Sequence, residues 1–455
     1  MINLAKIKTS YVCQNCGSVS SKWLGKCPDC NAWNTFQEEV IEKQSSNKNS
    51  LSKYNPTALP KNIIDIKGVE TSRFATGISE LDQVLGGGIV TGSVVLIGGE
   101  PGIGKSTVML QVAGILSDKN KKLLYVSGEE SQSQIKMRAD RLDVKAKNLE
   151  LLTTTSFEDV LYTLENNTYD YVIIDSIQTI VSKDLSSSGG TVGQVRHITY
   201  NLVEIAKSRA ITVFIIGQVT KDGNIAGPKV LEHLVDTVLY FEGDYSRGVR
   251  ILRSVKNRFG KSDEVGIFEM SSKGLLEADN KAFISSNNEV ASGKVLCPVL
   301  EGSRPFIVEI QALVAPTFFQ FPKRNSTGFD LNRLNMLIAI IEKKGGINLS
   351  SADIYLNIAG GLKINEPAAD LAVCAALISS FREVPISYSN IFAGELGLSG
   401  EVRNISNIDA RISEATKFGM KKFFVPNLVE KNENIELINI KNIINLLDYI
   451  KIDNK

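Results

Sequence analysis

A glycine-rich segment lies between a strand-like run and a helix-like run, and it restricts the possible folds of this chain more than any other feature. Residues 98–107 read GGEPGIGKST and match the pattern G-x-x-x-x-G-K-[ST] from Gly99 to Ser106. The apolar run SVVLI precedes this segment and STVMLQVAGILSDK follows it. A strand, a tight glycine loop and a helix in this order are typical of a P-loop, in which backbone N–H groups and the helix N-terminus surround phosphate oxygens. The pattern alone also occurs by chance, but this context favours a nucleotide site.

The residue types of the loop have separate tasks in such a site. Glycines leave no Cβ between the backbone and the phosphates. The Lys105 ammonium can reach the β- and γ-phosphates, and the Ser106 hydroxyl can bind Mg²⁺. We therefore expect ATP to be bound by these residues: Gly99, Glu100, Pro101, Gly102, Ile103, Gly104, Lys105, Ser106 and Thr107.

The region that contains the loop alternates strand-like and helix-like runs from about residue 61. This alternation predicts an α/β fold whose parallel sheet is covered on both faces. Asp175 ends the apolar run YVIID. A carboxylate at the end of a neighbouring strand is needed to hold the Mg²⁺ shell, so we expect Asp175 to bind magnesium together with Ser106.

Two further strand-like runs end in polar side chains that suit hydrolysis. Glu129 and Glu130 follow YVSG, and Gln218 follows FIIG. Hydrolysis needs a group that orients or deprotonates water, and the position after the second core strand favours Glu129. Either glutamate could instead be a solvated charge in a turn. The Gln218 amide is expected to sense the γ-phosphate.

Four cysteines near the N-terminus form two C-x-x-C pairs, Cys13 with Cys16 and Cys27 with Cys30. Each pair can present two thiolates from one turn, and two facing turns complete the closed tetrahedral sulfur site of a structural zinc. Two disulfides or a redox pair are the alternatives, but four soft ligands without an open position favour zinc. Because so small a module has almost no core, zinc would supply most of its folding energy.

Length and composition limit the organisation of the chain. A chain of 455 residues is too long for one core. We expect a zinc ribbon over residues 1–40, a linker over 41–60, an ATPase domain over 61–285 and a C-terminal domain over 286–455. The formal net charge is only +1, so any binding of a polyanion would depend on local patches. No signal peptide or apolar membrane span is found, which predicts a cytoplasmic protein.

The pentapeptide KNRFG follows the strand-like run VRILRSV and comprises Lys256, Asn257, Arg258, Phe259 and Gly260. Lys256 and Arg258 are separated by one residue, so they share a face of an extended segment. A lone K-x-R is usually a solvated basic turn. The neighbouring aromatic residue and glycine favour a functional role instead.

Together these motifs resemble known families. The order of the P-loop, Glu129, Asp175 and Gln218 is similar to the RecA-type ATPase core, which hexameric helicases of the DnaB kind share. A C4 zinc module, this core, KNRFG and a C-terminal extension resemble the RadA (Sms) family of bacterial DNA-repair proteins over nearly the whole chain.

The resemblance implies a DNA-stimulated ATPase that drives branch migration on single-stranded and branched DNA during the response to DNA damage stress. It implies a hexameric ring and the RecA recombinase as a partner. In such a ring Lys256 would reach a phosphate bound by the neighbouring subunit, and Arg258 would brace the same interface. The catalytic residues would then be Lys105, Glu129, Asp175, Gln218, Lys256 and Arg258.

Several cations could contact DNA in such an assembly. In RecA-like proteins the loops that follow two strand ends face the central channel; here these loops are residues 182–197, with Arg196, and 220–233, with Lys221 and Lys229. Disorder is the alternative for both. The C-terminal run FPKRNSTGFDLNRLN adds Lys323, Arg324 and Arg333, with a solvated face as the alternative.

The chain from about residue 291 resembles the proteolytic domain of Lon. In NEPAAD, Ala368 stands where the Lon serine would be, and Asp409 falls near the place of the Lon lysine. Neither side chain can replace that nucleophile or base, so we expect a scaffold that closes the ring and no peptidase.

Two other functions remain open from the sequence. The run GISELDQVLGGGI before the P-loop also occurs in nucleotide-switched signalling ATPases of the KaiC type, which lack the zinc module and the Lon-like tail. An ATP-dependent protease is the other alternative, which Ala368 weakens.

Overall fold

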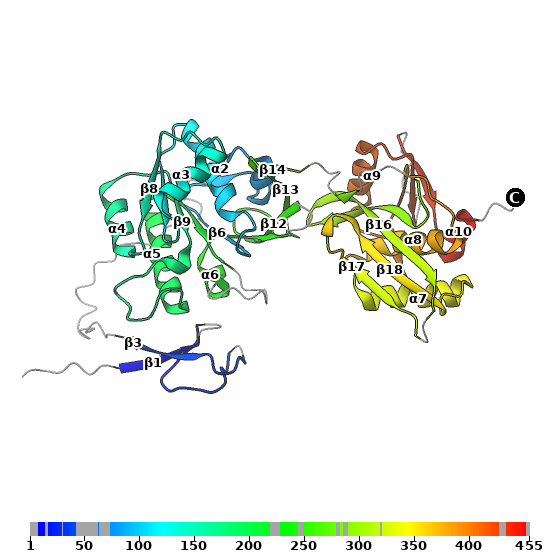
Figure 1. Cartoon of the computed structure of the whole chain (residues 1–455), viewed down its shortest axis with the longest axis horizontal. Coiled ribbons are helices and arrows are strands. Elements are labelled where there is room, and N and C mark those ends of the chain that lie inside the picture. Colours follow the sequence, from blue (N-terminus) through cyan, green and yellow to red (C-terminus); the bar gives the residue numbers. More distant parts are fainter. Residues whose placement is uncertain are drawn as a thin grey trace, which may run out of the picture. The chain divides into compact units, whose positions relative to one another are not determined.

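The computed structural model describes residues 8–13, 17–29, 31–41, 62, 73–218, 228–243, 249–278, 283–284, 290–318, 321–426 and 434–451. The chain divides into two compact units (Figure 1). The first comprises Met1–Glu242 with Arg250–Glu277, and the second comprises Gly243–Val249 with Ala278–Lys455.

A small antiparallel sheet occupies the N-terminal part of the chain. Its strand order is β2-β1-β3, with β1 at Lys8–Cys13, β2 at Val19–Ser20 and β3 at Phe36–Ile41. Cys13 at the end of β1 lies opposite Phe36 at the start of β3. Cys13, Cys27 and Phe36 form its buried cluster. So small a cluster contributes little burial of apolar surface.

A nine-stranded sheet of order β14-β13-β12-β11-β6-β10-β9-β7-β8 organises the first unit. The strands are β6 (Val94–Gly99), β7 (Leu123–Ser127), β8 (Leu149–Thr153), β9 (Tyr171–Asp175), β10 (Thr212–Ile216), β11 (Thr237–Glu242), β12 (Val249–Asn257), β13 (Val265–Ser271) and β14 (Gly274–Glu277). The neighbours from β11 through β8 pair in parallel, as the alternation of runs predicts. Strand β12 is antiparallel to β11, and β14 is antiparallel to β13.

Helices cover both faces of this sheet (Figure 1). One apolar core contains side chains of α1 (Ser79–Val84), α2 (Lys105–Asp118) and α3 (Gln132–Arg141). The other contains side chains of α4 (Phe157–Asn166), α5 (Val192–Arg209) and α6 (Pro228–Leu234). Every residue of β6, β7 and β10 is buried, which explains why these strands read as continuous apolar runs.

Short elements complete the first unit. Strand β4 (Arg73–Phe74) pairs with β5 (Ile89–Val90), and the 3₁₀ turn η3 (Ile177–Thr179) follows β9. Helix α3 begins with a capping box, in which the Ser131 hydroxyl accepts from the Gln134 N–H and the Gln134 side chain accepts from the Ser131 N–H.

The second unit contains a seven-stranded sheet of order β17-β18-β16-β15-β19-β22-β23. Its strands are β15 (Lys294–Glu301), β16 (Arg304–Pro316), β17 (Arg324–Thr327), β18 (Ala352–Ile358), β19 (Asn390–Phe392), β22 (Lys422–Val425) and β23 (Glu436–Asn439), and β20 (Glu395–Leu396) pairs with β21 (Val402–Arg403). Its helices are α7 (Leu331–Gly345), α8 (Asp370–Arg382), α9 (Ile408–Lys417) and α10 (Ile443–Tyr449), with 3₁₀ turns η5 (Ala359–Gly361) and η6 (Pro367–Ala369).

Helix α8 is buried over nearly its whole length, consistent with its small residues. No helix within the described ranges is long and apolar enough to cross a membrane.

Candidate functional site

The glycine-rich loop connects β6 to α2, as the sequence predicts. Gly104 precedes α2 with a φ of 120°, and a Cβ there would lie 2.8 Å from the Leu275 side chain. Glycine is therefore required at this position for both its conformation and its size. Lys105 is the first residue of α2, and its Nζ donates hydrogen bonds to the carbonyl oxygens of Gly99 (2.7 Å) and Glu100 (2.8 Å).

Lys105 is only 6% exposed. Burial lowers the pKa of its ammonium from 10.5 to about 8, and the negative charges of Asp175, Glu129 and Glu100 partly oppose this shift. A buried cation among carboxylates is well placed to receive phosphate oxygens, because bound anions favour its charged form.

The strand register brings the carboxyl ends of β6, β10, β9 and β7 to one edge of the sheet. Ser127 of β7 lies opposite Asp175 of β9, Asp175 lies opposite Ile216 of β10, and Ile216 lies opposite Ile97 of β6. Glu129 comes two positions after Ser127, and Gln218 comes two positions after Ile216. Gly99 likewise comes two positions after Ile97. The carboxyl ends of these parallel strands therefore carry the P-loop together with Glu129, Asp175 and Gln218.

Glu129 is in direct contact with two other polar side chains. The Ser176 hydroxyl donates to Glu129 Oε1 at 2.5 Å, and Gln218 Nε2 donates to Oε1 at 3.0 Å and to Oε2 at 3.3 Å. The structure thus brings Glu129 and Gln218 together. It adds Ser176, to which the sequence analysis assigned no role.

Asp175 is held by a residue that the sequence analysis missed. The Tyr125 hydroxyl donates a hydrogen bond to Asp175 Oδ2. Burial, followed by the nearby Asp175 charge, raises the pKa of Tyr125 well above its ordinary value, so the phenol remains a donor. A polar aromatic residue inside an otherwise apolar strand was the available signal for this contact.

The two adjacent glutamates differ in their surroundings. Glu130 forms an ion pair with Arg138 of α3, and its backbone N–H donates to the Ser127 hydroxyl. Glu129, in contrast, faces Ser176 and Gln218. The contacts therefore favour Glu129 over Glu130 for a catalytic task.

The pentapeptide forms the end of β12 and the turn that follows it. Lys256 is half-buried, and its Nζ donates to the carbonyl oxygens of Glu232 and Val235, the latter at 2.9 Å. Arg258 Nη1 lies 3.1 Å from Asp236 Oδ1. Both cations thus contact the segment between α6 and β11. Lys256 is not a freely solvated turn residue, because these two carbonyl oxygens hold its ammonium. Burial first and the Arg258 charge second lower its pKa.

The remaining residues of the pentapeptide shape the turn. Asn257 Oδ1 accepts a hydrogen bond from the Phe259 N–H at 3.0 Å, and Arg73 donates to the Phe259 carbonyl oxygen. A Cβ at Gly260 would lie 3.1 Å from the Gly86 Cα, so the close approach of the two chains requires a small residue.

The pentapeptide lies away from the P-loop of its own chain. Lys256 is opposite Val238 of β11, which in turn is opposite Leu96 of β6. Leu96 precedes Gly99 by three residues, which is about 10 Å along a strand. Asp236, the partner of Arg258, accepts a hydrogen bond from the N–H of Val94 at the first residue of β6. The two cations therefore belong to the amino-terminal edge of the parallel strands, opposite the nucleotide edge.

The predicted DNA-contacting cations of the first unit lie in different settings. Arg196 is exposed but lies on α5, which begins at Val192, so the predicted loop of 182–197 ends earlier than expected. Gln194, fully buried, holds that loop in a defined conformation: its Nε2 donates to the carbonyl oxygens of Ser182, Leu185 and Ser187. Disorder is therefore excluded for residues 182–191.

The second predicted loop is only partly visible. Lys221 lies outside the described residues, and of Lys229 only the backbone, in α6, is described.

In the second unit, Lys323 is exposed, and Arg324 Nη1 lies 3.4 Å from Asn335 Oδ1. Arg333, predicted as part of the same basic stretch, instead pairs with Asp370 through two nitrogens. The prediction of a DNA-facing Arg333 is wrong, because a fully buried carboxylate already binds its charge.

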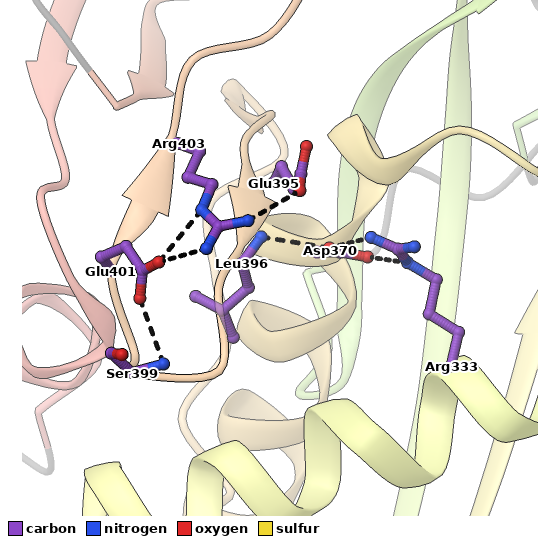
Figure 2. Close-up of polar contacts among 7 residues, drawn as sticks. All are labelled: Arg333, Asp370, Glu395, Leu396, Ser399, Glu401 and Arg403. Atoms are coloured by element: carbon purple, nitrogen blue, oxygen red, sulfur yellow. Dashed lines mark hydrogen bonds and ion pairs between the residues drawn. The ribbon is translucent and has the colours of Figure 1, made fainter.

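The Arg333–Asp370 pair belongs to a polar network at the start of α8 (Figure 2). Asp370 also accepts a hydrogen bond from the Leu396 N–H at 3.1 Å. Figure 2 shows that Arg403 lies between Glu395 and Glu401 on the nearby β20–β21 pair. Burial raises the pKa of Asp370, and the bonds from Arg333 and Leu396 oppose this shift.

The two residues singled out in the Lon-like segment, Ala368 and Asp409, differ in their exposure. Ala368 is buried beside this network, and Asp409 is exposed in the first turn of α9. The buried cation is Arg411, which the sequence analysis missed. Arg411 is bonded to the Glu366 carboxylate and to the carbonyl oxygens of Pro298 and Ser406.

The N-terminal module contains the same turn twice. The Gly17 N–H donates to the Cys13 carbonyl oxygen at 2.8 Å, and the Asn31 N–H donates to the Cys27 carbonyl oxygen at 2.9 Å. Gly17 and Asn31 both have positive φ, 76° and 59°. Two such turns fit the two halves of a C-x-x-C metal site. Cys16 and Cys30 lie outside the described residues, and within those ranges no group of three or more metal-binding side chains comes together.

Comparisons with known proteins agree with these regions. Residues 11–38 match the family model of a rubredoxin metal binding domain, residues 60–224 match an AAA domain, and residues 333–428 match the subunit ChlI of Mg-chelatase.

Curated relatives cover nearly the whole chain. The DNA repair protein RadA of Bacillus subtilis is 46% identical over 448 residues, covering 97% of this chain and 98% of the relative. The RadA proteins of Listeria monocytogenes and Campylobacter jejuni are each 48% identical, covering 95% and 93% of this chain and 94% and 95% of the relatives. At this identity and coverage, the chain belongs to the family of the DNA repair protein RadA.

Proposed function

We propose that this chain is a DNA-stimulated ATPase of DNA repair that drives branch migration and heteroduplex extension on single-stranded and branched DNA. Membership of the RadA family and the AAA domain match support the broader function, a DNA-repair ATPase. The observation that carries the motor function is the placement of two half-sites. Lys105, Glu129 and Gln218 gather at one edge of the sheet, whereas Lys256 and Arg258 lie at the other.

The nucleotide half-site would work as follows. Backbone N–H groups of the P-loop and the Lys105 ammonium bind the phosphates of ATP. Ser106 and Asp175 would hold Mg²⁺, which neutralises charge on the phosphates when bound. Glu129 orients or deprotonates the attacking water, and Gln218 responds to the γ-phosphate through its bond to Glu129.

The second half-site would serve a neighbouring subunit. Because the pentapeptide lies at the opposite edge from its own P-loop, Lys256 is better placed to meet a phosphate of another copy, with Arg258 bracing the interface. A cation supplied in this way raises the rate by about 10³–10⁵-fold in P-loop GTPases. Such mutual completion fits a closed ring, and we propose a hexamer.

The other parts of the chain would support this motor. Residues 1–40 would bind zinc through Cys13, Cys16, Cys27 and Cys30, residues 41–60 would link them to the ATPase domain at 61–285, and residues 286–455 would form a scaffold without peptidase activity. DNA contacts are expected from Arg196, Lys221, Lys229, Lys323 and Arg324. We propose the RecA recombinase as partner and the cytoplasm as location.

The test is ATP turnover with and without single-stranded DNA, combined with branch migration of a labelled three-strand substrate. We expect DNA to raise the rate and Lys105→Ala to abolish both activities. A wild-type protein whose turnover ignores DNA would instead support a nucleotide-switched signalling ATPase of the KaiC type.

A further inference from the structure

Gln178 is the one residue of η3 whose side chain connects the nucleotide edge to a second loop. It follows Asp175 and Ser176 by a few positions, but it contacts neither the P-loop nor Glu129 in any described interaction. Its Nε2 donates a hydrogen bond to the main-chain carbonyl oxygen of Gln218 at 3.3 Å. Gln218 in turn holds Glu129. A displacement of Gln178 would therefore affect the Glu129 carboxylate through Gln218.

The main chain of Gln178 lies close to the loop 182–191. A Cβ built at Gly190 would lie 3.4 Å from the Gln178 carbonyl oxygen, and one built at Gly189 would lie 2.9 Å from the Val181 side chain. Gly190 has a φ of 76°. The loop therefore lies against the main chain of Gln178 and against Val181. A side chain at Gly189 would collide with Val181, and the positive φ of Gly190 favours glycine.

Hydrogen bonds with two side chains hold the rest of this loop in one conformation. Gln194 binds three of its carbonyl oxygens, and Glu158 accepts hydrogen bonds from the Lys183 N–H at 2.7 Å and the Ser182 hydroxyl at 3.2 Å. A displacement of one part of this loop would therefore also displace its contact with Gln178.

One atom of Gln178 lacks a partner. Its Oε1 is buried, and it accepts no hydrogen bond from any residue that the structure describes. A buried amide oxygen without a donor is costly, so a second position of this amide that supplies a donor would offset the loss of its bond to Gln218.

We propose that Gln178 is a positioning residue that couples the loop 182–191 to the Glu129–Gln218 contact, so that DNA bound by Arg196 at the adjacent start of α5 changes the rate of ATP hydrolysis through this loop. Gln178 itself touches no reacting atom. The inference rests on the proposed DNA-stimulated activity, and it adds the route by which DNA acts.

The experiment compares Gln178→Met and Gln178→Ala with the wild-type full-length protein. Met keeps the length of the side chain but removes the amide, whereas Ala removes both. The measured quantity is the stimulation factor, the ratio of kcat with and without oligo(dT), together with the KM for ATP and the oligo(dT) affinity by fluorescence anisotropy. Losing one neutral hydrogen bond corresponds to about three- to tenfold. We expect the stimulation factor to fall by about this amount in both variants, while KM and oligo(dT) affinity stay within about twofold.

Gln134→Ala serves as the matched control, because it removes another glutamine side chain, one that caps the exposed start of α3. Its stimulation factor should equal that of the wild type. The inference is overturned if the Gln178 variants are stimulated as strongly as the wild type. It is equally overturned if their basal and stimulated rates fall by the same factor, since that marks a purely structural role. A wild-type protein without stimulation overturns the proposed function itself, and is recognised before any variant is compared.

Discussion

Gln218 donates hydrogen bonds from one nitrogen to both carboxylate oxygens of Glu129, at 3.0 and 3.3 Å. The two residues are 89 positions apart in the chain and follow strands that are not neighbours in the sheet. A carboxylate engaged in this way has fewer lone pairs free to bind an attacking water. Hydrolysis would then require Gln218 to turn toward another acceptor, such as a phosphate oxygen.

Glu129→Gln should slow hydrolysis while leaving nucleotide binding intact. Removing a general base typically costs about 10²–10⁴-fold in rate. ATP affinity should change little, because Lys105 and the loop N–H groups are untouched. Single-turnover hydrolysis and equilibrium binding of a fluorescent ATP analogue measure the two quantities separately.

Glu130→Gln is the control for this prediction. The two glutamates are adjacent, but Glu130 pairs with Arg138 of α3, and both of these side chains are partly exposed. The hydrolysis rate of the Glu130 variant should remain within about threefold of wild type, because a partly exposed ion pair away from the reacting atoms contributes little. Equal losses in the two variants would remove the assignment of Glu129.

The affinity for ATP should depend on pH through Lys105. Its pKa in the free protein is about 8. Below pH 8 the ammonium is charged and ready for phosphate; above pH 8 binding must also take up a proton. Affinity for a non-hydrolysable ATP analogue should therefore fall as pH rises from 8 to 10, by at most about tenfold per pH unit. Lys105→Arg, whose guanidinium stays charged, should show a flat profile over this range, whatever its absolute affinity.

Lys105→Ala and Lys256→Ala should complement each other in mixed assemblies. Each variant alone is expected to be inactive, the first at the P-loop and the second at the donated cation. In a mixture, a subunit with an intact P-loop can lie beside one with an intact Lys256, so some sites become complete. Steady-state ATP turnover in the presence of DNA measures the recovery.

Co-assembly must be verified for the mixing experiment, for example by native mass spectrometry. Lys256→Ala also loses its bonds to the end of α6, so its melting temperature is compared with that of the wild type. If verified mixed assemblies show no activity beyond the sum of the separate variants, Lys256 does not act between subunits.

The sequence could predict the nucleotide edge because its geometry follows from local rules. Parallel strands end at one edge, so Glu129 and Gln218 meet once the strand–helix alternation is recognised. The contact of Tyr125 with Asp175 depends on the order in which β7 and β9 pair, which no local pattern encodes.

Other differences have similar physical causes. Arg333 and Asp370 lie on different helices and are 37 positions apart, so the run of cations in the sequence did not reveal that the Arg333 charge is neutralised. The early start of α5 was hidden by the serines and glycines of the preceding loop, although Thr191 is a residue type that often begins helices.

Cys13→Ser should release zinc and unfold the N-terminal module without affecting the ATPase domain. The described part of this module buries only a small apolar cluster, so bound metal would supply most of its stability. Zinc content by plasma mass spectrometry and tryptic cleavage within residues 8–41 are the measurements. Cys374→Ala, which removes a buried thiol of the second unit, should retain zinc. Retention of zinc and of protease resistance by Cys13→Ser would contradict the metal site.

Arg333→Ala should destabilise the second unit far more than Arg403→Ala. Asp370 is fully buried, so removing Arg333 leaves a carboxylate that must stay unpaired or take up a proton, at a cost of about 3–5 kcal/mol. Arg403 is more than half exposed, so water screens its pairs with Glu395 and Glu401 and they contribute little to stability. Thermal unfolding should be followed by calorimetry, because both tryptophans lie in the N-terminal module and their fluorescence does not report on this unit.

The double variant Arg333→Met with Asp370→Leu should recover much of the loss, because it removes the buried charge together with its partner. Equal destabilisation by Arg333→Ala and Arg403→Ala would show that the buried pair does not hold α7 to α8.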